Sequence, residues 1–131
     1  MSERRFLSPA TLSPPFGYSH VVEVPAGTIV YISGQVPLDT NGQLVGEDDF
    51  EAQTRQVFEN LTHALEAAGA TWSDVVKLDY FLRDVTQIAA VRAIRDDYVD
   101  TEHPPASTLV EVSGLFRPDV LVEIQATAIT D

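Results

Sequence analysis

The segment His103-Pro104-Pro105-Ala106-Ser107-Thr108-Leu109-Val110-Glu111-Val112-Ser113-Gly114-Leu115 decides the fold, together with a second run at residues 120–129. The two prolines fix φ and remove backbone donors, so they end whatever element precedes them. A β-branched, alternating run follows them, and a break at Ser113-Gly114 separates it from the second run. Two such runs joined by a short connection favour antiparallel neighbours in one sheet.

Alternation sorts the side chains of both runs between the two faces of that sheet. One face is apolar and suits a dry core; in the first run Val110 and Val112 are on the face opposite Leu109 and Glu111. The other face is mixed, with these members: Leu109, Glu111, Leu121, Glu123, Gln125 and Ile129. A carboxylate in mid-strand lies either on a solvated face or in a site, and spacing alone favours the solvated face.

The remainder of the chain predicts the order β-β-α-β-α-β-β. Residues 1–20 are rich in Pro and Ser and predict an irregular arm, and residues 21–33 predict a hairpin around Pro25-Ala26-Gly27. A long helix is expected between a cap at Asp48 or Asp49 and Gly69, because apolar residues recur there at helical spacing.

Residues 75–82 predict a further strand. A second helix follows it, with Asp84 or Thr86 as its cap and an apolar stripe from Ile88 to Val99. Each helix has a single apolar stripe, so both should lie on one face of a mixed sheet. The expected class is α+β, with residues 1–131 forming one domain. The mixed face is too apolar for open solvent and too polar for a sealed core, which suggests an oligomer interface with water-filled clefts.

Composition and charge exclude several classes of protein. There is no cysteine, hence no disulfide framework, thiolate metal site or cysteine nucleophile. The net charge of −12, from 20 acidic and 8 basic residues, argues against nucleic acid or an anionic membrane as a partner. The start of the chain lacks an apolar signal core, and no apolar run reaches transmembrane length, so a cytoplasmic protein is expected.

Three motifs stand out in the chain. They are Pro105-Ala106-Ser107-Thr108-Leu109-Val110-Glu111-Val112 with Val122-Glu123-Ile124, then Ser33-Gly34-Gln35-Val36-Pro37, and the segment around Tyr18-Ser19. They resemble the motifs of one known family, RidA, also called YjgF/YER057c/UK114. The resemblance covers nearly the whole chain. It implies a chorismate mutase-like homotrimer whose sheets line an inner barrel, with small-molecule sites between subunits and no cofactor or metal.

The activity implied by the resemblance is hydrolysis of a reactive enamine or imine to a keto acid and ammonia. Glu123 would be the catalytic group that positions water and moves protons, while Tyr18, Ser33 and Gly34 would border the substrate. The family's deaminases have an arginine after Pro-Ala, where this chain has Ser107. An arginine binds a carboxylate bidentately, and a serine offers one neutral hydrogen bond. Consequently 2-aminoacrylate is not the expected substrate.

Another arginine could supply the missing charge. Arg92 stands where the family usually has an asparagine near the cleft, although a surface pair with Asp96 on the same helix is the favoured explanation. Arg117 is a weaker candidate. His20 and His103 lack the carboxylate or cysteine neighbours of a metal site, and a structural role for His103 at the strand entrance is expected.

Two functions from different classes therefore stay open. The first is a Rid-type hydrolase or deaminase acting on an imine, enamine or related metabolite. The second is a non-catalytic trimer that binds a metabolite or a partner protein in the inherited cleft. Ribonuclease activity, described for some family members, gains little support from a chain this acidic.

Overall fold

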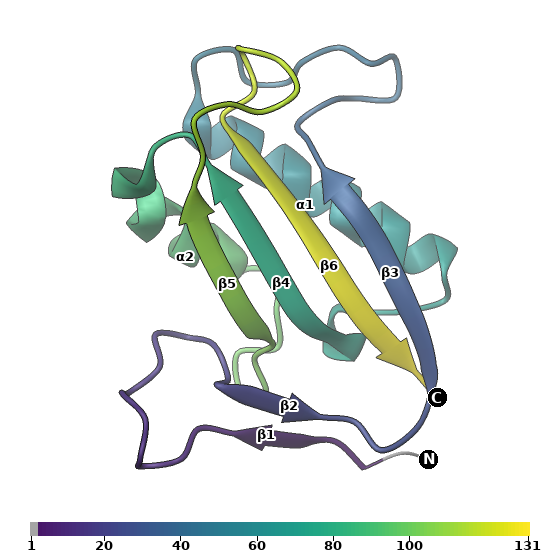
Figure 1. The fold of residues 1–131 in the computed structure, drawn as a ribbon. Coiled ribbons are helices and arrows are strands. Elements are labelled where there is room, and N and C mark those ends of the chain that lie inside the picture. Colours follow the sequence, from purple (N-terminus) through teal and green to yellow (C-terminus); the bar gives the residue numbers. More distant parts are fainter. Residues whose placement is uncertain (1–2) are drawn as a thin grey trace.

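The computed structural model describes residues 3–131 as an α+β fold in two layers. A four-stranded sheet has the order β3-β6-β4-β5, and β1 and β2 form a separate pair. Both helices lie behind the large sheet, on one face of it (Figure 1). The bounds of the elements are β1 Arg5–Leu7, β2 Val21–Glu23, β3 Thr28–Gln35, α1 Phe50–Ala67, β4 Val75–Leu82, α2 Ile88–Arg95, β5 Ala106–Glu111 and β6 Val122–Thr130. The prediction of two helices on one face of a mixed sheet is confirmed.

The expected pairing of the last two strands is wrong, because β4 lies between β5 and β6. β4 pairs with β5 in parallel and with β6 antiparallel. The connection at residues 112–121 passes over the end of β4, where Val112 donates to the Leu82 carbonyl and Arg83 donates to the Leu121 carbonyl. A long crossover through α2 thus decides the partner of β5, and that non-local contact outweighs the proximity of the two runs in sequence.

The faces expected for the side chains of β5 are also wrong, because the two faces are exchanged. In the parallel register Tyr80 is opposite Leu109 and Phe81 is opposite Val110. Tyr80 is buried beneath the helices, so Leu109 packs against the core and Val110 stays 40% exposed on the other face. Glu111 is not on the mixed face either. It is opposite Leu82, and its carboxylate accepts a hydrogen bond from the Val85 N–H. The apolar face expected for β6 is confirmed.

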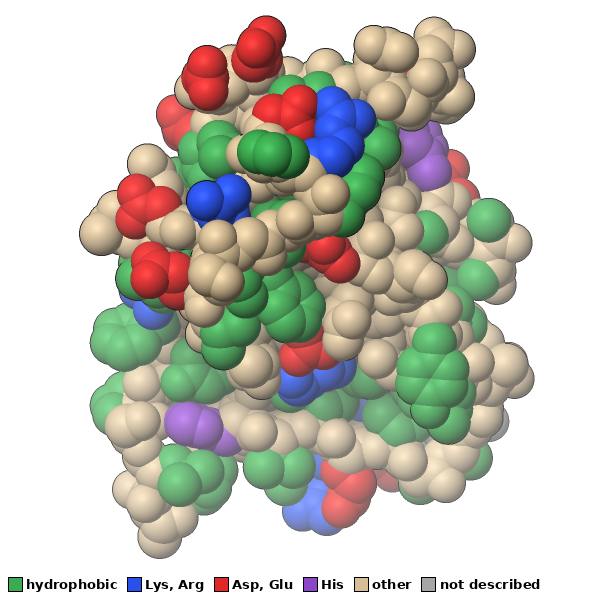
Figure 2. Space-filling view, turned by 45° about the horizontal axis from the view of Figure 1, so that its top comes forward, with side chains coloured by type: hydrophobic (Ala, Val, Ile, Leu, Met, Phe, Trp, Pro, Cys, Tyr) green, Lys and Arg blue, Asp and Glu red, His purple; other side chains and the backbone are tan. Residues whose placement is uncertain are grey.

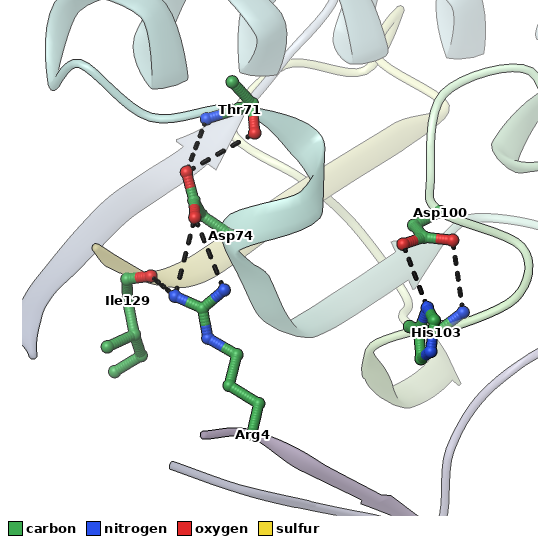
Figure 3. Close-up of polar contacts among 6 residues, drawn as sticks. All are labelled: Arg4, Thr71, Asp74, Asp100, His103 and Ile129. Atoms are coloured by element: carbon green, nitrogen blue, oxygen red, sulfur yellow. Dashed lines mark hydrogen bonds and ion pairs between the residues drawn. The ribbon is translucent and has the colours of Figure 1, made fainter. Parts of the chain in front are cut away.

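The N-terminal segment is more ordered than the predicted arm. β2 pairs with β1 instead of forming a hairpin with β3, and β3 pairs with β6. Arg4 attaches this small sheet to the large one, because its guanidinium reaches both Asp74 and the backbone carbonyl of Ile129 (Figure 3). Asp74 also closes a capping box with Thr71.

Helix α1 forms where its sequence signals predict. The Asp49 carboxylate accepts from the Ala52 N–H at the N-terminus, and Gly69 follows the C-cap with a φ of 71°. The buried face carries Val57, Phe58, Leu61 and Leu65, each 1% exposed or less. The Phe58 ring stacks on Tyr98 at a centroid distance of 5.0 Å, which joins α1 to the segment after α2.

The face of the sheet away from the helices is open and mixed. Figure 2 shows hydrophobic, acidic and basic side chains side by side over the strands. Lys77 pairs with Asp79 at its centre, and Gln125 donates to Asp79. Ile29 and Tyr31 on the edge strand β3 are 54% and 79% exposed. None of the helices among residues 3–131 is long and apolar enough to cross a membrane.

Candidate functional site

Glu123 and Gly34 form the first part of the candidate site. Glu123 is the second residue of β6 and is opposite Phe81, which places it on the open face. A bulge interrupts the pairing of β3 with β6 between Ile32 and Gln35. At this bulge a methyl group on Gly34 would lie 2.8 Å from the carboxyl carbon of Glu123. The missing side chain of Gly34 therefore leaves room for the Glu123 carboxylate.

The surroundings of this carboxylate leave it free to bind a ligand. No hydrogen bond or ion pair to it is found within residues 3–131. Ser33, the neighbour of Gly34, is exposed and lines a groove of about 380 Å³ between β3 and α1. A half-buried carboxylate with unused acceptor positions can hold a water molecule and accept a proton from it.

Tyr18 and Ser107 form a second part of the candidate site, at the β5 edge. The Ser19 hydroxyl donates to the Pro104 carbonyl at 2.6 Å, and the Ser19 N–H donates to the Pro105 carbonyl at 3.1 Å. These bonds tie the residue after Tyr18 to the two prolines that precede β5, of which Ser107 is the second residue. The Tyr18 ring is half-buried and packs edge-on against His20, with centroids 5.3 Å apart.

Arg92 is engaged, although not with the predicted surface partner. Its guanidinium lies over the Phe16 ring at 4.9 Å, a cation–π contact. Asp96 pairs with Arg95 instead, at 2.9 Å. Arg95 was missed in the sequence because a charged residue on α2 suggests a solvated face, yet this side chain is buried at 7% exposure. The sequence feature that accompanies this buried arginine is Gly17. It has a φ of 77°, and its backbone packs against the guanidinium.

The remaining candidates have structural contacts. Arg117 binds Asp119 through two hydrogen bonds of 3.1 and 2.8 Å, which lower the pKa of that carboxyl. His103 bonds Asp100 through both its backbone N–H and its ring (Figure 3), so it shapes the turn before β5. Among residues 3–131 no cluster of His, Asp or Glu could hold a metal ion.

One chain does not bring the two parts of the site together. Ser107 is opposite Leu78, and Leu78 is opposite Ala126, so Ser107 and Glu123 are two strands and three residues apart. With strand spacings of about 4.8 Å and a rise of about 3.3 Å per residue, their Cα atoms are about 14 Å apart in the plane of the sheet. They also face opposite sides of it, because Leu78 is on the helix side and Phe81 is not.

Comparison with known proteins points to one family. The model of the family described as Endoribonuclease L-PSP matches residues 9–130. A protein named 3-aminoacrylate deaminase RutC from Acinetobacter baylyi is 38% identical over 125 residues, covering 95% of this chain and 97% of that relative. A 2-iminobutanoate/2-iminopropanoate deaminase from Salmonella typhimurium is 38% identical over 125 residues, covering 93% and 91%.

The fold is similar to solved structures of the same family. The Rid family protein YyfB from Yersinia pestis, described as of unknown function, superposes with a TM-score of 0.86 at 40% identity, covering 96% of this chain and 98% of that one. The chain therefore belongs to the Endoribonuclease L-PSP family, whose members include the RutC and Rid proteins.

Proposed function

We propose that the protein hydrolyses the C=N bond of a small imine or enamine metabolite, in a site completed by two neighbouring copies of a homotrimer. The observation that supports this most strongly is the Glu123 carboxylate, held over Gly34 on the open face without a hydrogen-bond partner among the described residues. The names of two relatives at 38% identity, both deaminases, favour the same chemistry.

The proposed reaction needs only water and proton transfers. Glu123 holds a water molecule and accepts a proton from it while the water oxygen bonds to the imine carbon. Passing that proton to the nitrogen gives a carbinolamine. Glu123 then takes the proton of its hydroxyl group and delivers it to the amino nitrogen as the C–N bond breaks, so that a carbonyl compound and ammonia leave. A reaction of this kind uses a positioned carboxylate as base and then as acid. Ser33 and Gly34 border the reacting atoms, and Tyr18 and Ser107 of the adjacent copy close the other side.

The proposed substrate differs from 2-aminoacrylate because position 107 carries a serine. A serine hydroxyl cannot replace the bidentate, charge-assisted bonds that an arginine makes to a carboxylate. Arg92 is the predicted alternative cation, and its charge is already placed over the Phe16 ring. These contacts favour a substrate that is neutral, or whose charge lies away from the carbon that reacts.

The test is ammonia release from a panel of imines generated in situ by an amino-acid oxidase or a lyase. With an accepted imine, Glu123→Gln should lower kcat/KM by roughly 100-fold or more, because the base is lost while the shape is kept. Glu66→Gln, on the exposed side of α1, is the matched control and should leave the rate unchanged. Equal rates in wild type and Glu123→Gln would reject the proposed base.

The same assay tests the role of position 107. Wild type should not accelerate the decay of 2-aminoacrylate, and Ser107→Arg should gain that activity, with the exposed Ser113→Arg as control. Activity of the wild type on 2-aminoacrylate would show that the serine does not define specificity. Saturable binding of a panel member without turnover by any variant would favour the non-catalytic binding function instead.

A further inference from the structure

The arm before β2 is fastened to α2 by two arginines that the proposed reaction does not use. Arg95 is the last residue of α2, and its Nη1 donates to the Phe16 carbonyl at 3.2 Å. The Gly17 backbone packs on the same guanidinium, since a methyl group at Gly17 would lie 2.9 Å from Cζ. Arg92, one turn earlier, covers the Phe16 ring.

These contacts bracket Tyr18 on both sides. Gly17, immediately before it, packs on Arg95, and Ser19, immediately after it, is bonded to Pro104 and Pro105. Phe16 is 64% exposed, so burial of its ring does not hold this stretch in place. The position of Tyr18 near the start of β5 therefore depends on the polar contacts of Phe16 and Ser19 and on the packing of Gly17 against Arg95.

Burying the Arg95 guanidinium has a desolvation cost that an apolar side chain at the same position would not have. Removing a guanidinium from water costs several kcal/mol unless it is well paired, and its one carboxylate partner, Asp96, is half exposed. An apolar side chain would bury the same surface without that penalty. What the guanidinium adds is direction, because it donates to the Phe16 carbonyl while the Gly17 backbone packs on the same planar group.

We propose that Arg95 is a positioning residue, which holds the Phe16–Gly17 backbone so that Tyr18 keeps the orientation in which it borders the substrate. The contact to a ligand is made by Tyr18, and Arg95 acts through it. Only the expected effect of Arg95 on KM rests on the proposed function. Its effect on the order of the Phe16–Gly17 backbone is a property of the free protein.

The first measurement follows amide hydrogen exchange by NMR in the free protein. Arg95→Gln should speed exchange at the Ser19 amide, which is bonded to Pro105, by about tenfold or more, while the amides of β4 and β6 stay protected. Arg55→Gln, at the exposed pair with Asp97, is the matched control and should leave Ser19 unchanged. Unaltered protection of Ser19 in Arg95→Gln would overturn the proposal.

Where Arg95→Gln fails to fold, Gly17→Ala attacks the same contact from the side of the arm. Its new methyl group meets the guanidinium and its positive φ is unfavourable for alanine, so local exchange at Ser19 should again rise. Protection of Ser19 equal to that of the wild type in folded Gly17→Ala would also overturn the proposal.

The second measurement separates positioning from direct contact. With an accepted imine, Arg95→Gln should raise KM by about tenfold and change kcat little. In a Tyr18→Ala background the same substitution should change KM by less than about twofold, because the group through which it acts is gone. A full KM effect in that background would mean that Arg95 contacts substrate itself. If no imine is turned over, the proposed function fails while the exchange result still decides the role of Arg95.

Discussion

The Glu123 carboxylate owes its place to the absence of one side chain. Gly34 lies in the bulge of β3, and its φ is in a range open to any residue, so the backbone alone does not require glycine there. What requires it is space, because a methyl group would meet the Cδ and Cγ atoms of Glu123 at 2.8 and 3.0 Å. The pair is thus a steric arrangement that one added carbon atom disturbs.

This gives a prediction at Gly34. Gly34→Ala should displace the Glu123 carboxylate and lower kcat/KM by about 10- to 100-fold, since a shift of about 1 Å at a reacting group has that effect. The free energy of unfolding should change by less than about 1 kcal/mol, because the end of the Glu123 side chain can move. Gly114→Ala is the matched control, with open space around the added methyl. Full activity of Gly34→Ala would contradict the assigned contact.

At the scale of elements, α1 fixes two loops at the end of the sheet where β6 begins (Figure 1). Gln53 is fully buried, and its amide donates to the carbonyls of Gly46 and Asp119 at 3.0 and 2.9 Å. Its oxygen accepts from the Leu121 N–H at 2.8 Å. One side chain thus satisfies three backbone groups from two loops, just before β6 delivers Glu123.

Gln53→Met should be strongly destabilising, because it preserves volume and leaves those three groups without their partner. The expected loss is about 3 kcal/mol, as each buried unsatisfied group costs about 1 kcal/mol or more. Thermal and urea unfolding would measure it, with a fall in Tm of roughly 10 °C. Gln56→Met, which removes one bond to Asn60 on the same helix, is the control and should cost less than about 1 kcal/mol. Similar losses for both variants would contradict the account.

A second contact between elements, from Tyr98 to Glu59 of α1, predicts that the free energy of unfolding depends on pH. Partial burial and the 2.6 Å hydrogen bond to Glu59 raise the pKa of Tyr98 from 10.0 to about 12. Above pH 10 the unfolded chain therefore binds fewer protons at this residue than the folded one, and the free energy of unfolding falls as the pH rises towards 12. Tyr98→Phe should reduce that slope in urea titrations at pH 9 to 12. Burial also raises the pKa of Tyr80, so some slope remains. An unchanged slope would contradict the Tyr98 contribution.

At the scale of the whole molecule, the proposed site requires two surfaces that a single chain keeps apart, the open face and the β5 edge. They are separated by about 14 Å and by the thickness of the sheet. The open face also exposes Ile29 and Tyr31 beside charged residues, a mixture typical of a surface that meets another copy. The proposed cyclic trimer requires that the Glu123 part of each chain meet the Tyr18 part of the next.

The sequence predicted the layers, both helices and the strand at residues 75–82, because these follow from local periodicity and caps. The predicted pairing of β5 with β6 was wrong. It relied on their proximity along the chain, whereas the crossover through α2 places β5 beside β4. The meeting of Glu123 with Gly34 came from the motifs, since spacing alone favoured a solvated carboxylate. Arg95 is four residues after Val91, on the buried side of α2, yet it was not predicted to be buried, because arginine side chains are usually exposed.

The measurement that tests the shared site most directly is complementation between two variants of low activity. Glu123→Gln and Tyr18→Ala chains, differently tagged, would be co-expressed and their assemblies assayed with an accepted imine. In a random trimer about three quarters of assemblies contain both chains, and each of these has one intact site in three, so about a quarter of wild-type activity should return. Activity no higher than that of either variant alone would show that neighbouring copies do not complete the site.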